Sequence, residues 1–267
     1  MTTIAFVIPV RHQDNATDWP GLKRRLAQTM QSIANQQSAS WRGVVVANTG
    51  ADLPDMPNGF EVCRVDFPPN PKYDINDVNR NEALDTFRFD KGRRVLMGML
   101  QVRDSEYAMI VDDDDFVSNR LVDWIERNID VDCCDFDVGL KWSEGVPVTF
   151  LEKNFTKVCG TSHIVRLKYY KLPETFAAAS ETYIKNYLGS HHQISAFVRD
   201  AGGTVRSLPF PGAIYRVGHP GAHSQSKGIV WANLLDPKLM RQPRRWLRNM
   251  RSVRVVTTSM RREFSIR

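Results

Sequence analysis

The stretch KGRRVLMGMLQVRDSEYAMIVDDDD, residues 91–115, joins a helical pattern to an apolar run and four consecutive aspartates. Val95 and Met99 recur at the spacing of one helix face, and YAMIV (107–111) is typical of a buried strand. The aspartates, Asp112–Asp115, follow that strand directly. Because adjacent carboxylates repel one another, they indicate either a solvated acidic loop or a site for a divalent cation with oxygen ligands.

The same alternation of strand and helix precedes this stretch. IAFVIPV (4–10), WRGVVVANTGAD (41–52) and FEVCRVDF (60–67) are typical of strands, and residues 20–36 carry apolar side chains at helical spacing. This order predicts an α/β fold with a mostly parallel sheet flanked by helices. Ligands bind beyond the carboxyl ends of such strands, so we expect the residues that follow the strands to share one rim.

The composition is that of a globular protein, with 267 residues of which 42% are hydrophobic and 25% charged. No apolar run approaches the roughly 20 residues of a membrane span, and no secretory signal is visible. The cysteines form no CxxC pair, so we expect neither disulfides nor a zinc site, and we expect a cytoplasmic protein. The excess of basic residues lies in residues 238–267, so the mildly acidic body is not expected to bind nucleic acid.

In this order, the motifs resemble the core of bacterial GT-A glycosyltransferases. The Lys91-Gly92 pair, a helix containing Gly98, the turn 104–107 and the strand that ends in aspartates match that family's pattern. The resemblance covers roughly residues 1–130 well and 155–223 more loosely. It implies a Rossmann-like GT-A fold, a nucleotide-sugar donor with UDP as the commonest nucleotide, and Mn²⁺ or Mg²⁺ as cofactor.

The resemblance also implies roles for individual residues. Asp112 would face the ribose or a metal-bound water, Asp114 would ligate the metal, and Asp115 would support the site. Asn48 stands where the family has an aspartate that reads the base, which leaves the nucleotide open. The full donor-binding set that we expect is Pro9, Arg11, Asn48, Lys91, Arg94, Asp112 and Asp113.

Histidines occupy the other positions at which the family carries catalytic or metal-binding groups. His191 or His192 would replace the missing catalytic carboxylate as general base, with Glu181 as a third candidate, unless the histidine pair merely caps or packs a helix. His219 or His223 would complete the metal site as alternatives to each other, although a histidine in a loop is often an ordinary surface residue.

The basic tail predicts a helix over residues 239–256, with Trp246, Met250 and Val253 on one face. Such a helix favours an anionic membrane surface, and the alternative is that its apolar face packs on the body. We therefore divide the chain into a donor-binding half (1–135), an acceptor-binding and catalytic half (136–235), and a basic tail (236–267).

The interpretation that follows is a metal-dependent glycosyltransferase of the hexosyltransferase type. It would transfer a sugar from a UDP-sugar to a hydroxyl of a surface glycan such as lipopolysaccharide or exopolysaccharide, as a peripheral protein on the inner face of the membrane. Direct displacement with His191 as base would invert the anomeric centre, and without such a base a retaining mechanism stays open. One alternative is a haloacid-dehalogenase-type phosphatase, because residues 113–117 also match an Asp-x-Asp-x-Val pattern. A second alternative is a non-catalytic, cation-dependent scaffold bound to membranes.

Overall fold

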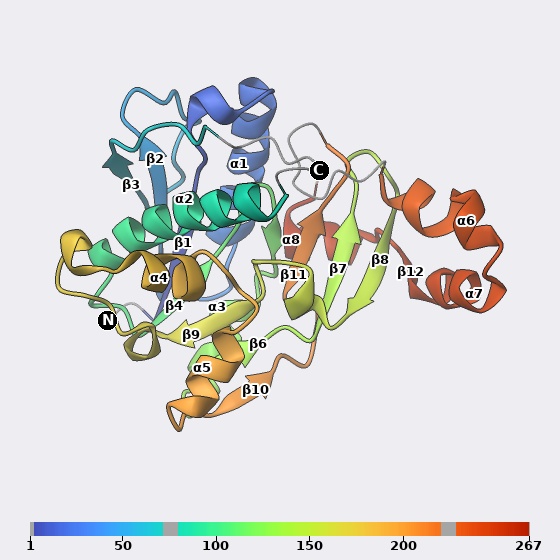
Figure 1. Ribbon diagram of the computed structural model, residues 1–267. Coiled ribbons are helices and arrows are strands. Elements are labelled where there is room, and N and C mark those ends of the chain that lie inside the picture. Colours follow the sequence, from blue (N-terminus) through green and yellow to red (C-terminus); the bar gives the residue numbers. More distant parts are fainter. Residues whose placement is uncertain (1–2, 72–79, 220–227, 267) are drawn as a thin grey trace.

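The computed structural model describes residues 3–71, 80–219 and 228–266 (Figure 1). A seven-stranded sheet has the strand order β10-β6-β9-β4-β1-β2-β3. Its β9 runs antiparallel to β4 and β6, while the other pairs in the sheet are parallel. The strands are β1 (Ile4–Pro9), β2 (Trp41–Asn48), β3 (Phe60–Val65), β4 (Tyr107–Ile110), β6 (Cys133–Asp135), β9 (His163–Arg166) and β10 (Val205–Ser207).

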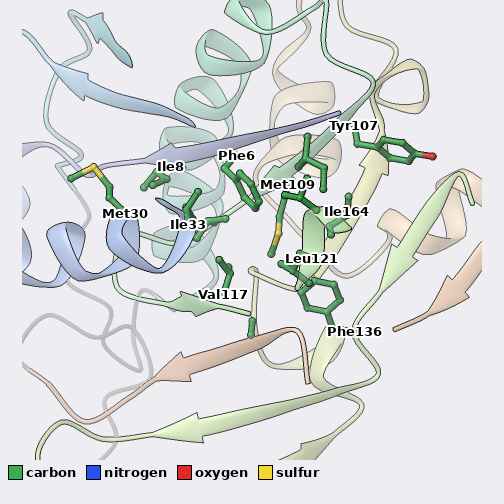
Figure 2. Close-up of a cluster of buried hydrophobic side chains, with 14 of the residues drawn as sticks. Phe6, Ile8, Met30, Ile33, Tyr107, Met109, Val117, Leu121, Phe136 and Ile164 are labelled. Atoms are coloured by element: carbon green, nitrogen blue, oxygen red, sulfur yellow. The ribbon is translucent and has the colours of Figure 1, made fainter. Parts of the chain in front are cut away.

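Helices cover both faces of this sheet. Their bounds are α1 (Trp19–Ala34), α2 (Arg80–Gln101), α3 (Leu121–Glu126), α4 (Glu181–Tyr183) and α5 (Ile194–Asp200). The side chains of β1 alternate between two cores, since Phe6 packs in the cluster with Met30 of α1 and Val7 packs in the cluster with Met99 of α2. Figure 2 shows the first of these cores. The predicted α/β fold with a mostly parallel sheet flanked by helices is confirmed.

Local sequence explains how α1 and α2 are placed. The Asp18 side chain caps α1 by accepting a hydrogen bond from the Gly21 N–H at 2.9 Å, and Pro20 lies in the first turn, where a missing N–H does no harm. Gly98 allows α2 to lie close against the sheet, because a Cβ there would approach Val7 to 2.6 Å and Val46 to 2.8 Å. The helix begins at Arg80, before the stretch in which the sequence pattern predicted it.

A second, five-stranded sheet has the order β12-β8-β7-β11-β5. Its strands are β5 (Phe116–Val117), β7 (Val138–Trp142), β8 (Val148–Lys153), β11 (Ala213–Arg216) and β12 (Val253–Val255). The basic tail forms α6 (Pro237–Met240), α7 (Pro243–Ser252) and α8 (Thr258–Phe264), and in Figure 1 α6 and α7 project beyond β8. The single helix predicted over 239–256 is therefore divided, since α6 ends at Met240 and α7 begins at Pro243. It also ends early, because Val253–Val255 pair with β8.

Candidate active site

A cavity of about 230 Å³ lies where the aspartate run, the residues after β1, α2 and β11 meet. Arg11 enters from the loop after β1, Lys91 from α2, and Arg216 from the end of β11. The loop that follows the helical turn Ile184–Leu188 forms another part of the wall. Of the predicted site residues, those that line this cavity are Pro9, Arg11, Lys91, Arg94, Asp112, Asp113, Asp114, His191 and His192.

Asp112 forms an ion pair with Lys91 across the cavity wall. Its backbone N–H donates to the Thr161 hydroxyl at 2.9 Å, which fixes the start of the aspartate run. Burial lowers the pKa of Lys91, but the Asp112 carboxylate outweighs that effect and raises the pKa, so the ammonium remains charged. Gly160 makes the approach possible, because a Cβ there would lie 2.8 Å from Asp112 and 2.9 Å from the Lys91 Nζ.

Asp113 and Asp114 have different surroundings although they are adjacent. Burial raises the pKa of Asp113 to about 6, and Arg11 partly offsets this effect. For Asp114, burial acts to raise the pKa, but the contact with His219 lowers it. The His219 Nε2 lies 2.8 Å from the Asp114 Oδ2. Asp114 therefore keeps its negative charge, with an imidazole directly beside it.

Asp115 lies beneath the cavity with no exposed surface. Its carboxylate accepts hydrogen bonds from the Thr161 hydroxyl at 2.7 Å, the Arg216 backbone N–H at 3.1 Å and the Cys159 thiol at 3.2 Å. Burial raises the pKa of Asp115 well above its usual range. These bonds connect the aspartate run to β11 and to the loop that carries Thr161.

Arg216 is a cavity residue that the sequence reasoning missed. It is 0% exposed, its guanidinium lies 4.2 Å from the centre of the Phe116 ring, and its Nη1 donates to Gln28 at 2.8 Å. Its Nε and Nη2 have no hydrogen-bond partner within the described part of the chain. Burial lowers the pKa of Arg216 to about 10, so the side chain is a cation in the cavity wall, with two buried nitrogens that lack a described partner.

Arg94 is held in place by two neighbours. Asp90 accepts from its Nε at 3.1 Å, and the Asn48 Oδ1 accepts from its Nη1 at 2.6 Å. The Asn48 amide in turn donates to the Phe67 carbonyl at 2.7 Å. Asn48 is 3% exposed and is not among the residues that line the cavity. Its connection to the site is the hydrogen bond that it accepts from Arg94.

The histidine pair lines the cavity in a loop set by close backbone packing. A Cβ at Gly189 would lie 2.0 Å from the Arg88 carbonyl, so only glycine allows this loop to approach α2. The rings of His191 and His192 have centres 4.1 Å apart, and the His191 Nε2 is buried without a partner among the described residues. Burial, reinforced by the charge of Lys91, lowers the pKa of His191 to about 3, so this ring is neutral.

Two other predicted residues lie outside the cavity. Glu181 does not line it and forms an ion pair with Lys185. His219 lines a small adjoining pocket together with Asp113 and Asp114. His223 lies outside the described residues.

The fit of a divalent cation depends on the donors around Asp114. Within residues 3–71, 80–219 and 228–266, no group of three or more His, Cys, Asp or Glu side chains is arranged to hold a metal ion. Asp114 and His219 offer one carboxylate and one imidazole in contact. Mg²⁺ commonly uses one or two protein ligands together with substrate phosphates and water, so this pair fits such a cation when a diphosphate supplies further oxygens.

Comparisons with known proteins give a likeness of fold alone. No protein-family model and no curated protein sequence matches the chain. The crystal structure of S. aureus TarS, residues 1–349, is similar over 93% of this chain and 79% of that chain, with a TM-score of 0.44 and 13% identity. A longer TarS structure is similar over 81% of this chain and 37% of that chain, with a TM-score of 0.38 and 13% identity.

The third similar structure is Rv0371C in complex with manganese, from Mycobacterium tuberculosis H37Rv. The similarity covers 80% of this chain and 90% of that chain, with a TM-score of 0.38 and 8% identity. The α/β fold with mixed sheets flanked by helices is a finding of the structure itself. With TM-scores below 0.5, these likenesses say nothing about the chemistry of this chain.

Proposed function

We propose that this protein transfers a sugar from a nucleoside diphosphate sugar, with UDP-sugar as the first candidate, to a hydroxyl of a surface glycan. The observation that carries the proposal is the cationic lining of the cavity beside the aspartate run. Arg11, Lys91 and Arg216 lie around a space that also borders Asp112 and Asp114. Several positive charges next to a candidate metal pair suit a diphosphate, which carries negative charge on both phosphates.

The donor would lie with its diphosphate against these cations. Arg216 lines the cavity, and two of its buried nitrogens have no partner among the described residues. A movement of this side chain toward the cavity would let a phosphate oxygen accept hydrogen bonds from them. A Mn²⁺ or Mg²⁺ ion at Asp114 and His219, when bound, supplies further positive charge to the leaving diphosphate. Asp112, held by Lys91, would accept hydrogen bonds from the ribose.

Proton transfer at the acceptor would fall to the histidine pair. As the acceptor oxygen forms its bond to the anomeric carbon and the bond from that carbon to the diphosphate breaks, the hydroxyl proton passes to a neutral imidazole. Direct attack from the opposite side inverts the anomeric centre. Burial is the main cause of the low pKa of His191 and makes it a weak base, and the charge of Lys91 adds to this effect. A bound diphosphate beside Lys91 would offset this second contribution to the pKa.

The phosphatase alternative has less support. In the Asp-x-Asp-x-Val pattern the second carboxylate would be Asp115, which is fully buried and accepts three hydrogen bonds. The pattern also lies after β4 in the middle of the chain, whereas it normally closes the first strand of the core. Cleavage of p-nitrophenyl phosphate that Asp113→Asn abolishes would favour the phosphatase over the transferase.

We propose that the tail contacts membranes through part of its surface. On α7, Leu247 is 48% and Met250 is 41% exposed, and Arg244 is exposed on the same helix. Trp246, in contrast, is half-buried and donates to the Leu234 carbonyl at 3.1 Å, so part of the predicted apolar face packs on the body. Among the described residues, no helix is both long and apolar enough to cross a bilayer.

The experiment that tests the proposal is calorimetry with a panel of UDP-, GDP- and CMP-sugars in the presence and absence of Mn²⁺. We expect one donor to bind, and its binding to weaken when Mn²⁺ is removed. The scaffold alternative predicts a response to the metal but none to any nucleotide sugar.

A further inference from the structure

A second concave surface lies away from the cavity, between α7 and β8 of the five-stranded sheet. This groove has a volume of about 780 Å³. In Figure 1, α7 stands beside β8 and β12 on the side of the second sheet that is far from α2. The basic side chains that line the groove are Lys141, Lys153, Arg245, Arg248, Arg251 and Arg254.

The charge of this groove is almost entirely positive. Glu152 is the one carboxylate in its lining, and it forms an ion pair with Lys141 at 2.7 Å. Arg245, Arg248 and Arg251 form no ion pair with any carboxylate of the described residues. Like charges gathered in one hollow repel one another, and an anionic ligand relieves that repulsion.

The wall of the groove is held in position before any ligand binds. Asn249 of α7 donates to the Asn233 carbonyl at 3.0 Å, and Trp246 donates to the Leu234 carbonyl at 3.1 Å. These bonds fix α7 against the helical turn Trp231–Leu235, whose residues Ala232 and Asn233 also line the groove. The arginines are therefore presented by a fixed helix rather than by a free tail.

The groove and the cavity share one face of the second sheet. Tyr215 of β11 lines the cavity, and its partner in the neighbouring strand is Lys141, which lines the groove. Lys141 is in turn the partner of Phe150 on β8, which also lines the groove. Residues paired across adjacent strands point to the same face and lie about 5 Å apart. The wall of the groove that Lys141 and Phe150 form is therefore continuous with the face that carries Tyr215 to the cavity.

We propose that this groove binds a linear glycan with an acidic group on successive sugars, as the extended part of the acceptor. The role of this glycan as acceptor rests on the proposed transferase function. The binding of an acidic glycan to the groove does not depend on that function. The concave shape favours a single strand over a flat bilayer. Single-stranded nucleic acid needs exposed aromatic platforms, whereas Phe150, the aromatic residue in the lining, is only 3% exposed.

The test is calorimetry with an oligogalacturonide, which carries a carboxylate on each sugar, and with neutral maltooligosaccharide of equal length. Titrations are run with chelator and without nucleotide, at low ionic strength and again at about 0.2 M salt, where exposed charges are screened. We expect the acidic oligosaccharide to bind, the neutral one not to bind, and the affinity to fall with salt.

The variant Arg245→Gln with Arg248→Gln should weaken this binding by about tenfold or more, because each arginine provides charge-assisted hydrogen bonds. The matched control is Arg241→Gln with Arg244→Gln, which removes the same charge from exposed residues of the same tail that do not line the groove. The control should remain within about twofold of the wild type, since only general electrostatics change.

The proposal is overturned if the wild type does not bind the acidic oligosaccharide, or if both double variants weaken binding equally. It is also overturned if the groove variant loses binding to a DNA oligonucleotide while its affinity for the acidic oligosaccharide stays that of the wild type. If no nucleotide sugar binds but the acidic oligosaccharide still does, the transferase proposal is wrong. The proposal that the groove binds an acidic glycan then stands by itself.

Discussion

At the residue scale, Arg216 is unusual because it is a fully buried cation that lines the cavity. A buried guanidinium with two nitrogens that lack a described partner lowers the stability of the folded state, unless a ligand accepts their hydrogen bonds. It lies 101 residues beyond Asp115 in the sequence, yet its backbone N–H donates to that carboxylate. The cavity thus draws its cations from separate parts of the chain.

Arg216→Met should weaken the binding of nucleoside diphosphate by about tenfold or more, because a charge-assisted hydrogen bond to phosphate contributes on the order of 1.5–3 kcal/mol. Replacement by an apolar side chain should alter the free energy of unfolding less than the binding, since a buried charge is replaced by a group that needs no solvation. Calorimetry and urea unfolding measure the two effects. Unchanged diphosphate affinity would contradict the role of Arg216.

Gly160→Ala tests the contact between Lys91 and Asp112. The added Cβ would lie under 3 Å from the Asp112 carboxylate and the Lys91 ammonium, so these side-chain ends must shift and the geometry of the ion pair changes. We expect donor affinity to fall several-fold. The control variant is Asn81→Ala, which lies on the exposed start of α2 and should leave donor binding unchanged. Gly202→Ala would not serve as a control, because the positive φ of Gly202 makes any side chain there strained. Nucleotide-sugar titrations of the two variants measure the difference, and equal affinities would show that the ion pair does not matter.

At this scale the sequence predicted much of the site. Asp112, Asp114, Lys91 and the histidine pair could be found because they lie at the ends of apolar strands or in motifs. Arg216 could not, because only the pairing of β11 with β5 and β7 returns it to the aspartate run. The signal available was an arginine that ends the apolar run at 213–215.

At the element scale, β9 contains a buried histidine that should make stability depend on pH. His163 is 3% exposed, and burial lowers its pKa from 6.5 to about 3. Below pH 6.5 the unfolded chain takes up a proton that the native protein does not, so the native state loses stability as the pH falls toward 3. The loss is about 1.4 kcal/mol per pH unit for one such group.

His163→Asn should therefore reduce the slope of unfolding free energy against pH between about pH 6.5 and 4 by roughly one proton. Denaturant unfolding at a series of pH values measures this slope, whatever the variant's stability at pH 8. His191, whose pKa is also lowered to about 3, contributes to the slope that remains. A slope identical to that of the wild type would contradict the burial of a neutral His163.

The element bounds show where sequence patterns lose information. The first turns of α2, from Arg80 to Asp90, include Ala83, Leu84 and Phe87 at helical spacing, but the sequence interpretation followed the pattern only from residue 91 and placed the helix start too late. In the tail, the helical pattern extended through Val253, but the β-branched segment Val253–Val255 pairs with β8 instead. The pairing of β12 with β8 ends α7 at Ser252 and holds the end of this helix beside the groove.

At the scale of the whole molecule, the five-stranded sheet was not predicted. Its strands are two to six residues long and come from segments far apart in the sequence, so no local pattern indicates it. This sheet carries β11 to the cavity and β8 to the basic groove. The seven-stranded sheet was easier to predict, because its β1, β2 and β4 are apolar runs separated by helices.

The distribution of charge and exposed apolar residues over the molecule gives a prediction about membranes. The protein should bind vesicles rich in phosphatidylglycerol at low salt and dissociate at high salt, because exposed arginines of the tail supply the attraction. Leu247→Ser with Met250→Ser should weaken the binding several-fold, since both side chains are exposed on α7. Vesicle sedimentation measures the bound fraction, and binding that is insensitive to both salt and these changes would count against the membrane contact.

The central claim is that the cavity beside the aspartate run binds a nucleoside diphosphate sugar. Its most direct test is calorimetric titration of the wild type and of Asp114→Asn with UDP-, GDP- and CMP-sugars in Mn²⁺. The account predicts that one donor binds the wild type, and that Asp114→Asn weakens this binding by about tenfold or more through loss of the metal carboxylate. Absence of binding for every donor, or equal binding by the wild type and Asp114→Asn, would contradict it.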